Sequence, residues 1–339
     1  MCGCLPADTS LRICLDCVQN QGARPKPMLT LNKHKSDGGC AMAAHSGFSI
    51  APELYRAWLR LAWFARSTFG VKARGIGWMA DRVREGFDFR FQGAPFHFSP
   101  EAARSYCLIA AGIPNEPETH RFLRRVLDGR SGVLFIDVGA SIGEFAIPMA
   151  SHPAVAQVLA FEPHPMSCQA LRASARLSPH GRLQIIQKGV AAHSGQASFD
   201  ISSAAPTAAG LVQAEGPGGT ADATEHIELC TLDEVVDTED VRPMILLIDI
   251  EGGELDAMKG ALGLIEQRNP LIIFEYNETT RRCFNLVQAR ELLGEGYRLF
   301  RMRSGDGLLD SQFDSTWNIV ALPIRGHWRG LRAQPALFA

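Results

Sequence analysis

Short apolar segments alternate with helix-length stretches from Gly132 to about Pro323. Nearly continuous apolar runs of this length, bounded by turn residues, are typical of parallel strands that are buried on both faces. The pattern therefore predicts an α/β fold with a Rossmann-like, doubly wound, mostly parallel sheet. A Gly/Asp turn at 304–307 favours an antiparallel hairpin at one edge. We expect strands at 133–138, 157–162, 183–188, 244–250, 271–276, 297–302 and 318–322.

A helical pattern lies ahead of this region. Leu54, Trp58, Leu61 and Ala65 recur at intervals of three or four residues, which predicts a helix within 52–85. Basic residues outnumber acidic ones in this segment. We favour a helix that packs its tryptophans on the main domain, and docking of the helix on a membrane surface or a partner is the alternative.

Alternating apolar and polar residues at 87–98 surround Gly93-Ala94-Pro95 and predict a β-hairpin, and a further helix is expected at 116–127. The chain thus divides into parts of different character. We expect a disordered extension at 1–45, accessory helices and a hairpin at 46–130, the main domain at 131–325 and a C-terminal tail at 326–339.

The first 45 residues are rich in Gly, Pro, Ser, Lys and Asn and show no period, which favours disorder. Cys2, Cys4, Cys14 and Cys17 lie there, and four thiolates can close a zinc site. An unstructured extension is favoured because the two pairs lie close together and lack the hairpin residues of a zinc ribbon. A second segment, 203–223, is expected to form a long loop.

Composition narrows the class of protein. The 34 Lys and Arg residues nearly balance the 36 Asp and Glu residues, so the whole chain has no electrostatic attraction for nucleic acid, and we expect no nucleic-acid partner. Cysteines outside the extension are scattered and unpaired in sequence, which indicates a reducing, cytoplasmic location. No apolar run approaches the roughly 18 residues of a membrane span, so neither a leader nor a transmembrane segment is expected.

The segment FIDVGASIGEF (135–145) carries the strongest chemical signal. A strand is expected to end at Asp137 and to turn through glycines into a helix, in the crevice where open α/β sheets bind ligands. The spacing G-x-x-x-G differs from the dinucleotide fingerprint. A carboxylate at this place repels a pyrophosphate but suits a cation, which favours S-adenosylmethionine over NAD or FAD. The turn contains Gly139, Ala140, Ser141 and Gly143.

Two further strands are expected to end in carboxylates. Glu162 follows the second strand in VLAFEPHP, where its two oxygens can accept both hydroxyl hydrogens of a ribose. In LLIDIEGGELDAMKGA, Asp249 and Glu251 have the same side-chain parity and would face one crevice if the extended geometry continues. Glu254 is better explained as support for the N-terminal turn of the following helix.

These three segments together resemble the signature blocks of FkbM-family S-adenosylmethionine-dependent methyltransferases. The similarity continues through LCTLDEVV, LIIFE and NIVALP and covers roughly 115–325 in order. Ser141 and His164 depart from the family pattern, which often has Asn at both positions. The resemblance implies a class I methyltransferase fold with S-adenosylmethionine as the cofactor.

The resemblance also implies a role for each matched position. Around the methionine part of the cofactor it places Asp137, Gly139, Ala140 and Gly143, with Ser141 in the same turn. Glu162, followed by Pro163, would bind the ribose. Asp249 and Glu251 would face the methyl-transfer side as catalytic residues, and the acceptor would be a hydroxyl on a sugar, glycan or small natural product.

An alcohol is a poor nucleophile, so we expect Asp249 or Glu251 to take its proton as the methyl is transferred, with Glu275 and His164 in reserve. The same carboxylates could instead hold a divalent metal, although no clear metal-ligand cluster stands out. Two alternatives remain open: a non-catalytic module that only binds the cofactor, and a nicotinamide-dependent oxidoreductase.

Overall fold

A computed structural model describes residues 48–71, 75–178, 180–200, 224–313 and 318–339. Its central sheet has eight strands in the order β12-β11-β13-β10-β9-β3-β4-β5. The five strands from β10 to β5 pair in parallel, and β13, β11 and β12 pair antiparallel at the other edge. The strands are β3 (Val133–Val138), β4 (Val155–Phe161), β5 (Leu183–Ile186), β9 (Met244–Ile248), β10 (Leu271–Glu275), β11 (Tyr297–Met302), β12 (Leu309–Asp310) and β13 (Asn318–Pro323).

The predicted mostly parallel α/β sheet is therefore confirmed, together with the antiparallel pairing of its last two predicted strands, β11 and β13, at one edge; the short strand β12 that follows the 304–307 turn was not predicted. The strands β3, β9 and β10 are buried along their whole length, which explains their continuous apolar sequences. Successive residues point to opposite faces of a strand, so Phe135 belongs to one hydrophobic core and Ile136 to the other.

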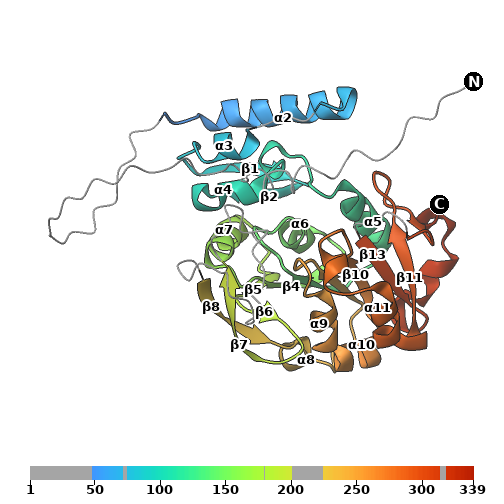
Figure 1. The fold of residues 1–339 in the computed structure, drawn as a ribbon. Coiled ribbons are helices and arrows are strands. Elements are labelled where there is room, and N and C mark those ends of the chain that lie inside the picture. Colours follow the sequence, from blue (N-terminus) through green and yellow to red (C-terminus); the bar gives the residue numbers. More distant parts are fainter. Residues whose placement is uncertain (1–47, 72–74, 179, 201–223, 314–317) are drawn as a thin grey trace, which may run out of the picture.

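Helices cover both faces of the sheet (Figure 1). One core includes residues of α5, α6 and α7, and the other includes residues of α8 to α11. The first group comprises α5 (Pro117–Leu127), α6 (Ala146–Ser151) and α7 (Pro165–Ala175), and the second comprises α8 (Leu232–Val235), α9 (Glu254–Lys259), α10 (Leu262–Arg268) and α11 (Leu286–Leu293). Single 3-10 turns lie at Pro100–Ala102, Ile109–Ala111, Thr280–Arg282 and Gly294–Gly296.

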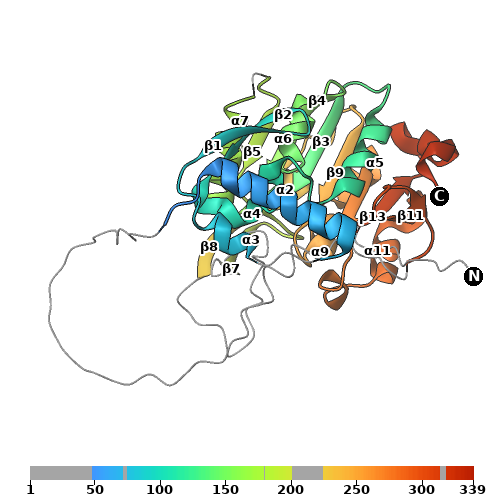
Figure 2. The same ribbon diagram turned by 90° about the horizontal axis from the view of Figure 1, so that it is seen from above.

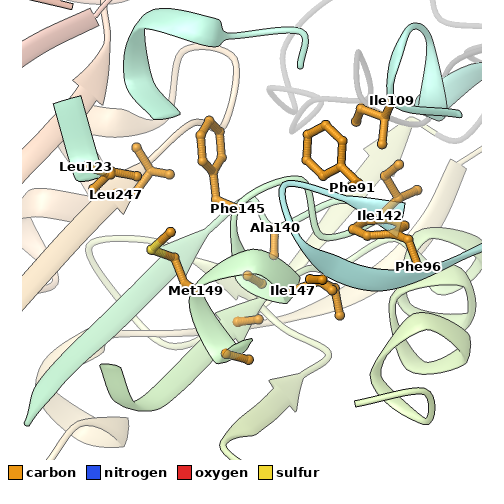
Figure 3. Packing of buried hydrophobic residues seen from close by; sticks show 14 of the residues in the cluster. Phe91, Phe96, Ile109, Leu123, Ala140, Ile142, Phe145, Ile147, Met149 and Leu247 are labelled. Atoms are coloured by element: carbon orange, nitrogen blue, oxygen red, sulfur yellow. The ribbon is translucent and has the colours of Figure 1, made fainter. Parts of the chain in front are cut away.

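The predicted hairpin is β1 (Phe87–Phe91) paired with β2 (Ala94–Phe98). Its turn is shorter than expected, because Gln92 and Gly93 alone make it, both with positive φ, and the next residue already begins β2. Figure 3 shows Phe91 and Phe96 of the hairpin near Ile142 and Ile147, which follow β3. The accessory segment and the main domain thus share one hydrophobic core.

The predicted helix within 52–85 is two helices, α2 (Pro52–Phe69) and α3 (Ile76–Ala80), followed later by α4 (Ala103–Tyr106). The break occurs because Gly70 takes a left-handed conformation and closes α2.

Trp63 is partly buried against the core, as expected for a tryptophan of this helix, but the recurring positions Leu54, Trp58, Leu61 and Ala65 are not the buried stripe. Tyr55, Leu59, Ala62 and Arg66 are buried, whereas Leu61 is 57% exposed. The apolar positions of α2 form two stripes, and the sequence pattern alone does not show which of them meets the core.

A three-stranded sheet, β6-β8-β7, was not expected from the sequence. It comprises β6 (Gly189–Val190), β7 (Gly195–Asp200) and β8 (Thr224–Cys230). The range expected as a C-terminal tail folds as 3-10 turns at Gly326–Ala333 and Pro335–Leu337. Its Trp328 is buried and donates a hydrogen bond to the carbonyl of Met244 over 2.7 Å.

Several expectations concern parts of the chain outside the described residues. They are the disorder or zinc binding of 1–45 and the loop at 203–223. The ranges given above for the domains stay a prediction. Among the described residues, no helix combines the length and the apolar character that a membrane crossing requires.

Candidate active site

The candidate site lies at the carboxyl ends of four parallel strands. Strands β4, β3 and β9 lie side by side (Figure 2), and β10 pairs with β9. Parallel strands place these ends at one edge of the sheet, which brings residues far apart in sequence together. Each strand carries a carboxylate at or just after its end: Asp137, Glu162, Asp249 and Glu275.

The turn after β3 is held against its neighbours through backbone hydrogen bonds. The N–H groups of Gly139 and Ala140 both donate to the carbonyl of Phe161, over 2.9 and 3.0 Å. Gly139 has φ +89°, and a Cβ there would lie 1.9 Å from the carbonyl oxygen of Asp249. Glycine is therefore required at position 139 by the close approach of the β9 end.

Close packing explains why position 143 is a glycine. It has φ +97°, and a Cβ there would lie 2.5 Å from Leu171 in α7 and 2.8 Å from Ile147 in α6. The glycine lets the helix after the turn pack closely on its neighbours. Both glycines therefore shape the turn through contacts within the protein.

Glu162 joins the turn after β3 to the loop after β4. One carboxylate oxygen accepts from the N–H of Ser141 over 2.8 Å, and the other accepts from the N–H of His164 over 2.7 Å. Pro163, between these partners, is partly exposed. Burial raises the pKa of Glu162 to about 7, although the two backbone hydrogen bonds lower it. Each oxygen keeps a lone pair, so the arrangement fits a ribose diol.

Asp137 is 2% exposed, and its Oδ2 has no hydrogen-bond partner. Burial, followed by repulsion from Glu162, raises its pKa to about 8, although a backbone hydrogen bond from Ala146 opposes the shift. A buried carboxylate oxygen without a partner is costly. A cationic group beside Asp137 would offset that cost, so this position fits the charged methionine part of S-adenosylmethionine.

Asp249 and Glu251 were expected to point in the same direction if the strand continued through them, and it does not. Strand β9 ends at Ile248, and Glu251 adopts φ +56° in a turn, so the extended geometry does not continue. The two side chains nevertheless interact. Burial and then repulsion from Glu251 raise the pKa of Asp249 to about 8, and burial followed by repulsion from Glu254 raises that of Glu251 to about 7.

Glu254 and Glu275 complete this part of the site. Glu254 is fully buried and accepts from the N–H groups of Ile250 and Gly252 over 3.1 and 3.0 Å. It therefore supports the turn before α9, close to the structural role expected for it. Glu275 is buried at the end of β10; burial and then repulsion from Asp249 raise its pKa well above the ordinary value, and it accepts from the side-chain amide of Asn277.

A further carboxylate of the site, Glu116 in the segment before α5, was not predicted from the sequence. The Glu116 carboxylate accepts from the amide of Asn318 over 2.6 Å and from the Thr119 hydroxyl over 2.9 Å. Burial and then repulsion from Asp249 raise its pKa. Glu144, in the block FIDVGASIGEF, accepts from the backbone and side-chain amides of Asn115, each over 2.9 Å. No local signal marks Glu116, because its partners come from distant parts of the chain.

The site thus gathers six carboxylates whose charge interactions are mostly with one another: Asp137, Glu162 and Glu275 are buried, and Glu116, Asp249 and Glu251 are half-buried. Desolvation is the largest cause of the raised pKa of each. Ionised carboxylates are costly in such a place without a cation. The residues therefore fit a positively charged nucleoside ligand, and a diphosphate would add negative charge to a site that already has an excess of it.

We expect the raised pKa values to make stability fall with pH. A buried carboxyl with a pKa near 8 keeps its proton at pH 6, whereas the unfolded chain has released it, so the folded state binds more protons. Each such group lowers the free energy of unfolding by up to about 1.4 kcal/mol per pH unit between the two pKa values. Urea denaturation at pH 5.5 and 8.0 and constant ionic strength measures the slope.

A bound cation should reduce that slope, because it favours the ionised carboxylates. S-Adenosylmethionine should therefore bind relatively more tightly as the pH rises from 6 to 8, and S-adenosylhomocysteine, which lacks the sulfonium charge, should show a smaller change. Equal pH dependence for the two ligands would contradict a role for the carboxylates in binding the sulfonium.

Throughout the described residues, no group of three or more His, Cys, Asp and Glu side chains is arranged to hold a metal ion.

Several known proteins are similar to this chain. Hexuronic acid methyltransferase AglP from Haloferax volcanii is 30% identical over 138 residues, which is 40% of this chain and 53% of that protein. The crystal structure of Methyltransferase FkbM from Methylobacillus flagellatus KT is 18% identical and covers 66% of this chain and 54% of its own, with a TM-score of 0.42. M. jannaschii TYW2 in complex with AdoMet is 14% identical and covers 70% and 84%, with a TM-score of 0.35.

The chain spans about half the length of the curated relative that it matches. The family comparison covers the described site more directly, because it begins at Asp137 and includes the glycine turn, Glu162 and the turn after β9. Residues 137–299 match the Methyltransferase FkbM domain. This part of the chain, just under half of it, is therefore similar to FkbM methyltransferase domains, and the similarity supports S-adenosylmethionine as the cofactor.

Proposed function

We propose that this protein transfers the methyl group of S-adenosylmethionine to a hydroxyl on a sugar, glycan or small natural product. One observation carries the proposal: buried and half-buried carboxylates from four strand ends and from the segment before α5 interact with one another at the edge of the sheet where open α/β folds bind ligands. The name of the archaeal relative, a hexuronic acid methyltransferase, supports a carbohydrate acceptor.

The residues divide the work of binding. Asp137 would face the charged methionine part, and Glu162 would accept hydrogen bonds from the ribose. The turn from Gly139 to Gly143 is fixed by its own contacts, so the cofactor would meet a preformed surface. S-Adenosylmethionine supplies a methyl group that is already activated by a sulfonium. The protein has to align the acceptor with it and exclude water.

The acceptor hydroxyl must lose a proton as the new bond forms. Asp249 is suited to take it, since its pKa of about 8 lies near neutral pH, where a base is most effective. Glu275 makes a hydrogen bond that opposes the rise of this pKa, so it would position the Asp249 carboxyl. Glu251 is the second candidate for the base, with a pKa of about 7.

Methyl transfer is tested with donor labelled in its methyl group. The protein is incubated with neutral sugars, uronic acids, glycans and a small-molecule extract of cells, and the labelled product is identified by mass spectrometry. Label on a hydroxyl oxygen is the expected result. Label on nitrogen or carbon would contradict O-methylation, and donor binding without transfer to any fraction would favour a non-catalytic module. Tighter binding of NADH than of S-adenosylhomocysteine would favour an oxidoreductase.

A further inference from the structure

Helix α2 lies on the outside of the molecule (Figure 1), and one of its faces has exposed apolar side chains. Its inner face packs on the domain through Tyr55 and Leu59, and Arg56 donates to the carbonyl of Ala110 over 3.0 Å. The opposite side presents residues at alternating intervals of three and four, which we call the α2 outer face. It consists of Leu54, Ala57, Leu61 and Phe64.

Further exposed apolar side chains lie in the same stretch of the chain as the α2 outer face. Trp78 in α3 is 55% exposed, and the Arg82 guanidinium lies 3.8 Å from the centre of its ring. Most of the strongly exposed large apolar side chains in the described part of the chain lie in this one segment, and a concentration of that kind marks a contact surface. They are Phe48, Leu54, Leu61, Phe64, Phe69, Val71 and Trp78, against Met166, Val235, Val241 and Val287 elsewhere.

The charge of the segment around α2 indicates which kind of partner the α2 outer face binds. Residues 52–85 contain seven basic and three acidic side chains, although the whole chain has a net charge of −2. Of these, Arg66 is buried and Arg56 is half-buried, while Glu53 and Glu85 are exposed. One of the acidic residues, Asp81, is neutralised by an ion pair with Arg104 at 2.5 Å. Exposed Arg60 and Arg84 accompany the apolar side chains. Aromatic and leucine side chains flanked by arginines are the composition of helices that lie in the interface of an anionic membrane.

We propose that the α2 outer face docks the protein on an anionic lipid surface. The leucine and phenylalanine side chains enter the boundary between headgroups and acyl chains, and the arginines contact lipid phosphates. A second copy of the chain is a poorer partner, because a symmetric contact would bring the same basic segment of both copies together. The proposal is independent of the acceptor, since none of these residues belongs to the carboxylate site.

Vesicle sedimentation of the full chain tests the proposal. The vesicles contain either phosphatidylcholine alone or phosphatidylcholine with phosphatidylglycerol. We expect binding to the anionic vesicles, and a loss of roughly tenfold or more in partitioning for the double variant Leu61→Glu/Phe64→Glu, which removes two apolar side chains and adds two negative charges. Both positions are more than half exposed, so folding should be retained.

The matched control is Val241→Glu/Val287→Glu, which places two charges at exposed apolar positions elsewhere. It should bind vesicles like the parent. Arg60→Gln/Arg84→Gln should lose binding to anionic vesicles specifically, with the remaining binding less sensitive to salt. S-Adenosylhomocysteine binding should be unchanged in every variant, which separates this surface from the active site.

Three results would overturn the proposal. The first is a parent protein that binds neither kind of vesicle, and the second is equal binding by Leu61→Glu/Phe64→Glu and the control. The third is self-association in sedimentation velocity that the same double variant abolishes while vesicle binding is absent. That result would identify the α2 outer face as a subunit interface.

Discussion

An Asp249→Asn variant is expected to lose methyl transfer by about two to four orders of magnitude, the usual contribution of a general base. Asparagine has nearly the same shape but cannot take a proton from the acceptor. It also removes the repulsion that Asp249 shares with Glu251 and Glu254. The folded protein should therefore be at least as stable as the parent, so that lost turnover reflects chemistry.

The measurement compares kcat, with the acceptor that the labelled-donor assay identifies, and the affinity for S-adenosylhomocysteine by calorimetry. Asp256→Asn is the matched control, because Asp256 lies exposed on α9 and pairs with Lys259. Unchanged turnover in Asp249→Asn would exclude Asp249 as the base. Glu251→Gln should then show the large loss, and retention of activity in both variants would contradict carboxylate base catalysis at this turn.

A Gly139→Ala variant is expected to lose cofactor binding and about 3 kcal/mol or more of stability. Its Cβ would lie 1.9 Å from a backbone oxygen of Asp249, and backbone cannot move aside as a flexible side chain can. The turn and the β9 end would have to separate. That movement would displace Asp137 and Asp249, the two carboxylates on either side of the contact.

Gly129→Ala separates the clash from the backbone strain. Gly129 also has a positive φ, of +67°, but a Cβ there would meet no atom within 4 Å. This control should cost about 1 kcal/mol, from the left-handed conformation alone. Urea denaturation and calorimetry with S-adenosylhomocysteine measure both variants. Equal losses of stability, with cofactor binding retained in Gly139→Ala, would show that the close approach is not needed.

The electrostatic character of the site connects these experiments. Carboxylates at the strand ends favour a cation, and the same carboxylates raise one another's pKa when no cation is present. Cofactor binding, stability and the ionisation of the base are therefore linked through the same buried groups. A change at one carboxylate should alter the pH dependence of the others.

Some features of the fold and the site could be predicted from residues that are adjacent in the sequence. Strand β3 was predicted at its observed bounds, because a short apolar run between turn residues favours a strand that is buried on both faces of a sheet. The glycine turn and Glu162 were likewise identified from residues next to a strand end. These features depend on neighbours in sequence, and strand order then brings them to one edge of the sheet.

Other features depended on contacts between distant segments. Both stripes of α2 are apolar, and only packing decided that Tyr55 and Leu59 are buried while Leu61 and Phe64 face outward. Glu116 entered the site because Asn318, 202 positions away, holds its carboxylate. The sequence by itself determined the fold class and the chemical kind of the site, since these follow from local polarity. The tertiary structure alone decided which faces are buried and which carboxylates meet, because burial and charge repulsion depend on neighbours in space.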